Sequence, residues 1–523
     1  MPPKPIHLPK PSNQLTMTQP HNLTFGIELE FLCIYAPGCF TNCVPDPTIL
    51  LPQYPDQPVS EAGAAIYHAL LAAGIPATGH ESLDEDINDP CPPYTRWSVT
   101  EDICNLTLTE RLHLPPHHRV ETVELSSRKL PYHPVSLWQK EVYTILRLLH
   151  RLERETGCRF LTNNSTGLHV HVGLPGPGEK IELRTAKNVL QLVTAFEGRI
   201  DLVHAVNRIR NPVPENGGEE EEGGGGDQIL YAGPSFFHFV NGLTSPTFTS
   251  TGGKAGGRGK ANIFDWLSTI ERMESYTSLA SVLKIRDREK FPMSSYGGEG
   301  GSGKTSAYNF DNLLPGSGEE GSGIDGGEGE GTGTIEFRQH CGTLDFLSIC
   351  AWTGLVVQMV WFCSWVGHEE FLSLLAKSVD LDFTLADFLD AIGVEEGIIR
   401  HFVEVEGGET IGVLGCEDDP LSAVPGEMER FCELLGQNEE EQNARVSEKV
   451  RAEVMRRKDY GIDSGRSVVI LPGLVTDEYQ ATCPQVANSG LQMTREEVVT
   501  QARLQLLKRL AAELRYTYGE ECA

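Results

Sequence analysis

Three segments that lie far apart in the sequence alternate ionisable and apolar residues, and this alternation most constrains the fold. The ionisable members are Glu28 and Glu30, His169 and His171, and the trio Glu336, Arg338 and His340. Side chains two residues apart on a β-strand point to one face, so each group predicts a polar strand face. The intervening residues are apolar: Ile27, Leu29, Phe31, Leu168, Val170, Val172, Ile335 and Phe337. Because unpaired charges are costly in a core, we expect a sheet with one apolar face and one polar basin.

The expected basin contains the side-chain types that bind divalent metals and phosphates. Hard cations such as Mg²⁺ prefer carboxylate oxygens and often bridge a protein to nucleotide phosphates. Arg338 suits a phosphate or carboxylate oxygen through bidentate hydrogen bonds. A single Glu-x-Glu or His-x-His strand is commonly only a solvated face. Three such rows in one chain favour a functional site.

Composition and spacing predict one large domain with interruptions. Hydrophobic residues make up 39% of the 523 residues, which is enough for a large core. We expect a disordered Pro-rich tail over 1–22, a catalytic domain over 23–367 and a mainly helical C-terminal region over 368–523. Three Gly- and Glu-rich inserts are expected to be flexible, at 213–228, 250–260 and 296–333.

Local signals predict an α+β fold. Ser60 is expected to cap a helix that ends at Gly74. Further strands are expected over 95–100, 119–126 and within 160–173, and further helices over 134–155, 184–206, 384–392 and 495–519. The predicted architecture is an antiparallel-rich sheet with helices on one face and the active site on the other.

Bulk properties disfavour several function classes. The net charge of −30 predicts repulsion from a phosphate backbone, so no nucleic-acid partner is expected. The 13 cysteines include no CxxC pair and the N-terminus has no signal-peptide pattern, which predicts a cytoplasmic protein. Residues 346–367 carry no charge and are long enough to span a bilayer. Their polar members Ser348, Thr353, Gln358 and Ser364 favour a buried core helix, so no membrane partner is expected.

Residues 298–305 match the P-loop pattern G-x(4)-G-K-[ST]. A functional P-loop follows a buried strand and opens a helix, whereas this match follows polar sequence and precedes a segment that ends in Pro315. We therefore expect a chance match in glycine-rich sequence, although Lys304 could still reach a phosphate. Tyr308 and Asn309 are expected to form a strand that precedes the last polar row.

Five motifs occur in an order that resembles the amidoligases of the glutamine synthetase superfamily. They are GIELE at 26–30, WSVTED at 97–102, VELSS at 123–127, NNSTGLHVHVG at 163–173 and TIEFRQHCGT at 334–343. Each motif alone is weak, but the ordered set covers roughly residues 23–365. The resemblance implies a glutamine synthetase-like catalytic domain that uses ATP and Mg²⁺.

The resemblance also implies roles for residues of the basin. Glu28, Glu30 and Glu124 would hold magnesium ions. Glu336 would bind the metal that bridges the phosphates, and His169 would complete a metal site or touch ATP. No second glutamate lies two residues from Glu124, so metal occupancy is expected to differ from that of glutamine synthetase.

The implied reaction joins a carboxylate to an amine through an acyl phosphate. His171 would contact nucleotide or substrate, and Arg338 would stabilise the transferred phosphoryl group. Asp102 matches an acidic residue of the family, and its role is left open. The partners would be small-molecule or peptide carboxylates and amines, and a homo-oligomer is compatible with the superfamily.

Two alternative functions stay open from the sequence. A metal-dependent hydrolase would hold zinc on His169 and His171, and stoichiometric zinc in the purified chain would favour it. A non-catalytic relative would bind nucleotide or a protein partner through the acidic loops. In that case Glu30→Ala or Arg338→Ala would leave the biological role intact.

Overall fold

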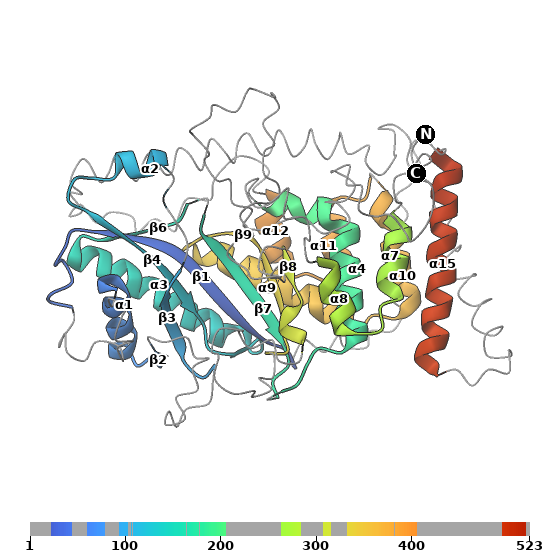
Figure 1. The fold of residues 1–523 in the computed structure, drawn as a ribbon, viewed down its shortest axis with the longest axis horizontal. Helices are drawn as coiled ribbons and strands as arrows, with labels where there is room; N and C mark the ends of the chain where they lie inside the picture. Colours follow the sequence, from blue (N-terminus) through green and yellow to red (C-terminus); the bar gives the residue numbers. More distant parts are fainter. Residues whose placement is uncertain are drawn as a thin grey trace.

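The fold is built on a nine-stranded sheet in the order β2-β3-β4-β1-β7-β9-β8, with β5 and β6 also paired to β1 (Figure 1). A computed structural model describes residues 22–43, 60–78, 94–102, 106, 108–163, 165–176, 178–204, 263–283, 307–314, 332–380, 382–404 and 494–518. Within them, every strand pair except β2–β3 is antiparallel. The predicted α+β class with an antiparallel-rich sheet is confirmed.

The long strand β1 lies in the middle of the sheet and has partners on both sides. The strands are β1 (Thr24–Tyr35), β2 (Ala77–Thr78), β3 (Trp97–Glu101), β4 (Arg119–Ser126), β5 (Leu130–Pro131), β6 (Arg159–Leu161), β7 (Gly167–Gly173), β8 (Tyr308–Asn309) and β9 (Ile335–Cys341). Burial along β1 is nearly continuous, as expected for a central strand with paired strands on both sides.

Helices cover the apolar face of the sheet. They are α1 (Glu61–Ala72), α3 (Val135–Thr156) and α9 (Phe346–Trp365). Ile27 and Val170 are fully buried on this face, and the ring of Phe25 meets that of Trp138 on α3 edge to face at 5.1 Å. The alternation of apolar residues therefore buries one side of the sheet, as the sequence predicts.

The opposite face is not wholly polar. Leu32 and Ile34 lie beyond Glu30 on the same side of β1 and form a small buried cluster with Leu106, which precedes helix α2 (Leu108–His113). This cluster closes the basin face at one end of the strand, so the charged part of the face is limited to the middle of the sheet.

Helix α1 begins where its sequence predicts. The Ser60 hydroxyl accepts a hydrogen bond from the Gly63 amide at 2.9 Å, and Glu121 of β4 accepts one from the Ala62 amide at 2.8 Å. Both satisfy amides that have no partner within the helix. After the helix, Gly74 adopts a left-handed conformation with φ of 76°.

A second group of helices packs beside this layer. They are α4 (Leu183–Ile200), η1 (Asp201–Val203), α7 (Ile263–Glu271), α8 (Tyr276–Leu283), α10 (His368–Ala376), η5 (Lys377–Val379), α11 (Leu385–Ala391) and α12 (Glu396–Glu404). Phe196 of α4 stacks on Phe388 of α11 at 4.6 Å. Packing therefore continues past residue 367. Residues 405–493 lie outside the described part, so a mainly helical region over 368–523 stays a prediction.

The apolar helix α9 lies in this core. Among the described helices it alone is long and apolar enough to cross a membrane by length and composition. However, 67% of its most apolar window is buried inside the fold, and Trp352 and Val356 are fully buried. This is the burial that the sequence predicts for a core helix.

A β-bulge in β9 makes one prediction wrong. The register with β7 shifts between Leu168 and Val170, so Arg338 and Gln339 together lie opposite His169. The extra residue turns His340 away from the row of Glu336 and Arg338. Instead, His340 packs against Trp352 of α9 at 5.6 Å, on the helix-covered face. His340 is therefore not part of the basin.

The segment 296–333 is more structured than its composition predicts. Residues 307–314 form the edge strand β8 and the short helix η4 (Asp311–Leu313). Tyr308 and Asn309 form the expected strand, in register with Phe337 and Glu336. The tail up to residue 21, the inserts at 213–228 and 250–260, and the P-loop match with Lys304 lie outside the described residues.

The C-terminal helix α15 (Arg495–Tyr518) packs along α7 and α10 at one end of the molecule (Figure 1). Its fully buried Arg503 donates to Asn188 at 2.9 Å and to Gln191 at 2.6 Å, both on α4. Arg503 also lies 3.3 Å from a carboxylate oxygen of Glu271 and 5.0 Å from the centre of the Phe371 ring. One buried cation thus ties α15 to three other helices.

The pKa values of Arg503 and Glu271 show that each buried charge depends on its partners. Burial lowers the pKa of Arg503 to about 10, against the attraction of Glu271. Burial would favour a neutral Glu271, but the charges of Arg503, Arg184 and Lys187 outweigh it and hold the pKa of that carboxyl below its usual range. Each charge is tolerated in the interior because the others are present.

We expect Arg503→Ala to lower the free energy of unfolding by about 3–5 kcal/mol, because it leaves Glu271 buried with fewer cations. Urea unfolding of the full chain measures this change. The control is Arg509→Ala on the same helix, where the side chain is 40% exposed and its pair with Glu513 is weak, so a change below about 1 kcal/mol is expected. Equal losses in both variants would show that Arg503 does not anchor α15.

Candidate metal centre

The register of four neighbouring strands brings the ionisable residues onto one face. The opposed pairs are Glu30 of β1 with Glu124 of β4, Glu28 of β1 with His169 of β7, and His171 of β7 with Glu336 of β9. Residues directly opposite each other share a face, so these side chains form one continuous basin. The predicted convergence of distant segments is therefore present in the structure.

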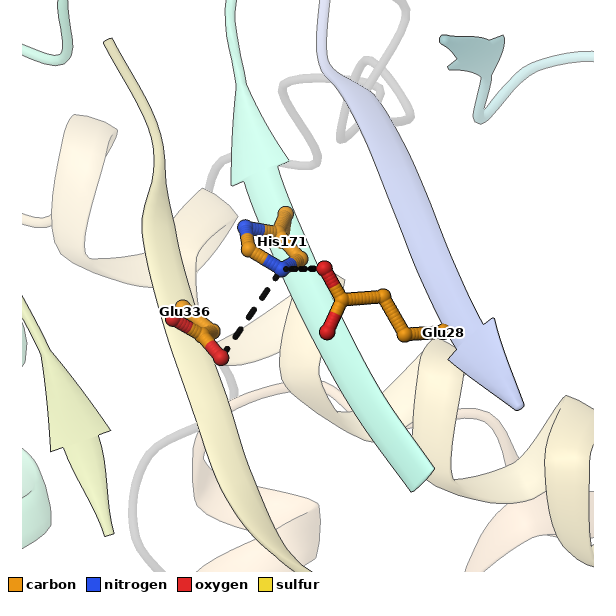
Figure 2. Close-up of side chains that lie close together, drawn as sticks. All are labelled: Glu28, His171 and Glu336. Atoms are coloured by element: carbon orange, nitrogen blue, oxygen red, sulfur yellow. Dashed lines mark hydrogen bonds and ion pairs between the residues drawn. The ribbon is translucent and has the colours of Figure 1, made fainter. Parts of the chain in front are cut away.

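Three residues from three strands form the first cluster of donors. Glu28, His171 and Glu336 each offer one ligand atom, and these atoms lie within 4.8 Å of one another. Figure 2 shows the imidazole of His171 between the two carboxylates. Its Nε2 is 2.8 Å from Glu28 Oε1 and 3.9 Å from Glu336 Oε1. This spacing suits a shared cation as well as a shared proton.

His169 links this cluster to the rest of the basin. Its Nδ1 lies 2.9 Å from Glu28 Oε2 and 3.8 Å from Glu336 Oε1, and its Nε2 lies 3.3 Å from Glu30 Oε1. The side chain is only 2% exposed. His169 is therefore a fixed central element of the basin.

The second cluster consists of carboxylates alone. Glu30, Asp102 and Glu124 offer one oxygen each within 4.8 Å of one another. Asp102, which follows the end of β3, is the third member. The sequence leaves its role open, and the structure places it beside Glu30 and Glu124. Ser126 donates a hydrogen bond of 2.6 Å to Glu124 and orients that carboxylate.

A tight turn before β7 fixes one oxygen of Glu30. The Asn163 side chain accepts hydrogen bonds from the amide and the hydroxyl of Ser165, at 2.9 and 2.7 Å. This local capping is typical of Asn-x-Ser turns. It presents the amide of Gly167, which donates to Glu30 Oε2 at 2.6 Å. The motif at 163–173 thus contributes to the basin twice, through its turn and through its two histidines.

The basin carries more negative charge than its own cations balance. Burial favours the neutral form of Glu28, but the charges of His171 and His169 and their hydrogen bonds together outweigh it and hold the pKa of Glu28 well below its usual range. Despite burial, Glu28 and Glu336 raise the pKa of His171 to about 9. Burial and the charge of Glu28 raise the pKa of Glu124 well above its usual range. A bound metal cation could therefore replace the proton on Glu124, since either one neutralises negative charge in the basin.

The donor set fits hard divalent cations. Its members are the carboxylates of Glu28, Glu30, Asp102, Glu124 and Glu336 and the imidazoles of His169 and His171. Oxygen donors dominate, which suits Mg²⁺ or Mn²⁺ better than the nitrogen- and sulfur-rich sites typical of zinc. The residues present can thus hold the metal that the motifs imply.

Most of the expected site residues lie together. Arg338 pairs with Glu336 of the first cluster. His340 lies on the other face, and Lys304 is outside the described residues. Asn309, which sequence reasoning placed only as part of a strand, donates a 2.8 Å hydrogen bond to Glu336. Its sequence signal was only its place in the strand expected before the last polar row.

Comparison with known protein families and with curated proteins finds no match for this chain.

We expect Glu30→Gln and Glu124→Gln each to weaken Mn²⁺ binding by at least about tenfold, because each removes a charged oxygen ligand without changing side-chain size. Electron paramagnetic resonance of free Mn²⁺ during titration of the full chain measures the affinity. Glu396→Gln is the control, since that side chain is 71% exposed on α12. Unchanged binding in both basin variants would exclude the second cluster as a metal site.

Proposed function

We propose that this chain is an ATP- and Mg²⁺-dependent carboxylate–amine ligase, an amidoligase. The observation that carries the proposal is the pair of adjacent donor clusters on one sheet face, with Arg338 paired to Glu336 of the first cluster. Two neighbouring sites of oxygen donors suit the several cations that accompany nucleotide phosphates. The ordered motifs that resemble the amidoligases contribute every member of these clusters.

The basin residues divide into two roles. Glu28, His171 and Glu336 would hold one cation, and Glu30, Asp102 and Glu124 another. When bound, magnesium ATP supplies the phosphoryl group that turns a substrate carboxylate into an acyl phosphate. His169 keeps the carboxylates of both clusters in place through its two ring nitrogens.

Arg338 is the residue proposed to act on developing negative charge. Its Nη1 pairs with Glu336, and it lies on the same strand face, so the guanidinium is held at the border of the first cluster. A fixed cation there would stabilise the transferred phosphoryl group without reorganisation. Its planar donors match phosphate oxygens better than a lysine would.

The finer assignments belong to the same proposal. They are a glutamine synthetase-like catalytic domain over 23–367, a mainly helical C-terminal region, a cytoplasmic location, and small-molecule or peptide acids and amines as substrates. A homo-oligomer is compatible with them. Carboxylate and amine do not condense unaided near neutral pH, so the reaction would consume ATP and release ADP and phosphate in equal amounts.

We expect ATP and Mg²⁺ to give ADP release that rises when the correct acid and amine are both present. A panel of amino acids, peptides, dicarboxylates and polyamines tests this with a coupled ADP assay, and mass spectrometry then identifies the amide. Arg338→Lys should lower the rate by about 100-fold, because it loses the forked donors that stabilise the transferred group. Lys129→Arg, on the loop between β4 and β5, is the control.

Two results would count against the ligase. If no acid and amine of a broad panel stimulate ADP release, the proposal loses its main support. If the purified chain carries stoichiometric zinc, a hydrolase built on His169 and His171 becomes the better hypothesis.

A further inference from the structure

Asn309 is a buried polar residue that contacts a proposed metal ligand from outside the five motifs. It lies on the edge strand β8, directly opposite Glu336 of β9, and is only 4% exposed. His171, Glu336 and Asn309 therefore form one cross-strand row over three strands. This row continues the first donor cluster outward to the edge of the sheet.

The orientation of the Asn309 amide is fixed by its own turn. Its Oδ1 accepts a hydrogen bond from the Asp311 backbone amide at 2.9 Å, at the start of η4. Since Oδ1 is used in this way, the amino group must point to Glu336, where Nδ2 donates to Oε2 at 2.8 Å. Turn geometry thus determines which donor reaches the carboxylate.

The two oxygens of Glu336 consequently have different surroundings. Oε2 is held by Asn309, on the side of β8. Oε1 faces the basin, where it pairs with Arg338 and lies 3.8 Å from His169. It also lies 3.9 Å from His171 (Figure 2). A cation between Glu28, His171 and Glu336 would meet Oε1 alone, because turning the carboxylate to offer both oxygens breaks the bond to Asn309.

One-oxygen coordination distinguishes between the two common hard cations. Mg²⁺ requires near-ideal octahedral geometry with one oxygen from each carboxylate, whereas Ca²⁺ accepts six to eight oxygens and readily takes both oxygens of a carboxylate. We infer that Asn309 is a positioning residue that holds Glu336 in one-oxygen coordination and so favours Mg²⁺ over Ca²⁺ at the first cluster. This inference rests on the proposed magnesium-dependent function.

Calorimetric titration of the nucleotide-free full chain with MgCl₂ and with CaCl₂ tests the inference. In Asn309→Ala we expect Mg²⁺ affinity to fall by about tenfold or more, as is common when the partner of a metal ligand is lost. Ca²⁺ affinity should fall much less, because the released carboxylate can offer both oxygens. The ratio of Ca²⁺ to Mg²⁺ affinity should therefore rise by at least about threefold.

Asn309→Leu is a second variant of nearly the same shape. It removes the donor to Glu336 without adding a carboxylate that could itself bind the cation, so the same rise in the affinity ratio is expected if the alanine variant does not fold. Asn188→Ala is the matched control, since it removes a buried asparagine from the α15 network and should leave the ratio unchanged. A shared loss of stability without a change in ratio would mean that Asn309 has only a structural role.

The outcomes separate this inference from the proposed function. If the wild-type chain binds Mg²⁺ but neither Asn309 variant changes the ratio of affinities, the inference is wrong and the ligase proposal is unaffected. If the wild-type chain binds neither ion with or without ATP, the magnesium-dependent function fails, and the inference fails with it.

Discussion

The concentration of carboxylates on one face of a central sheet is the constraint on which the rest of the structure depends. Five carboxylates meet two imidazoles and one guanidinium there, and burial together with the charge of Glu28 raises the pKa of Glu124. Gathering these charges costs free energy. The opposite face offsets that cost, because its apolar residues are fully buried against α3 and α9.

Much of the sheet could be predicted because successive side chains of a strand point to opposite faces, so residues two apart share a face. The spacing of Glu28 and Glu30, and of His169 and His171, determines which face they share, whatever their partners are. His340 shows the limit of this reasoning. Its spacing from Arg338 is the same, but a bulge inserts one residue and reverses its side. Bulges depend on cross-strand pairing, which local alternation does not reveal.

Long-range polar contacts were the other part that sequence could not supply. Arg503 lies in the helix that the sequence predicts over 495–519, but that prediction does not include its burial. It is fully buried because Glu271, Asn188 and Gln191 converge on it from other elements. Asn309 lies in a strand that the sequence predicts, but nothing in the sequence predicts its contact with Glu336. In both cases the partner is distant in the chain, so no local pattern distinguishes the residue from its solvated neighbours.

Fold and site are coupled most closely in β1, because its two faces have opposite requirements. A shift of one residue would carry Glu28 and Glu30 into the apolar core and Ile27 and Leu29 into the basin, which is prohibitive in both directions. The register is therefore fixed by more than main-chain pairing. The Ile27 amide donates to the hydroxyl of Ser127 at 2.8 Å, just beyond the end of β4. The chemistry of the basin thus helps to select the strand alignment that creates it.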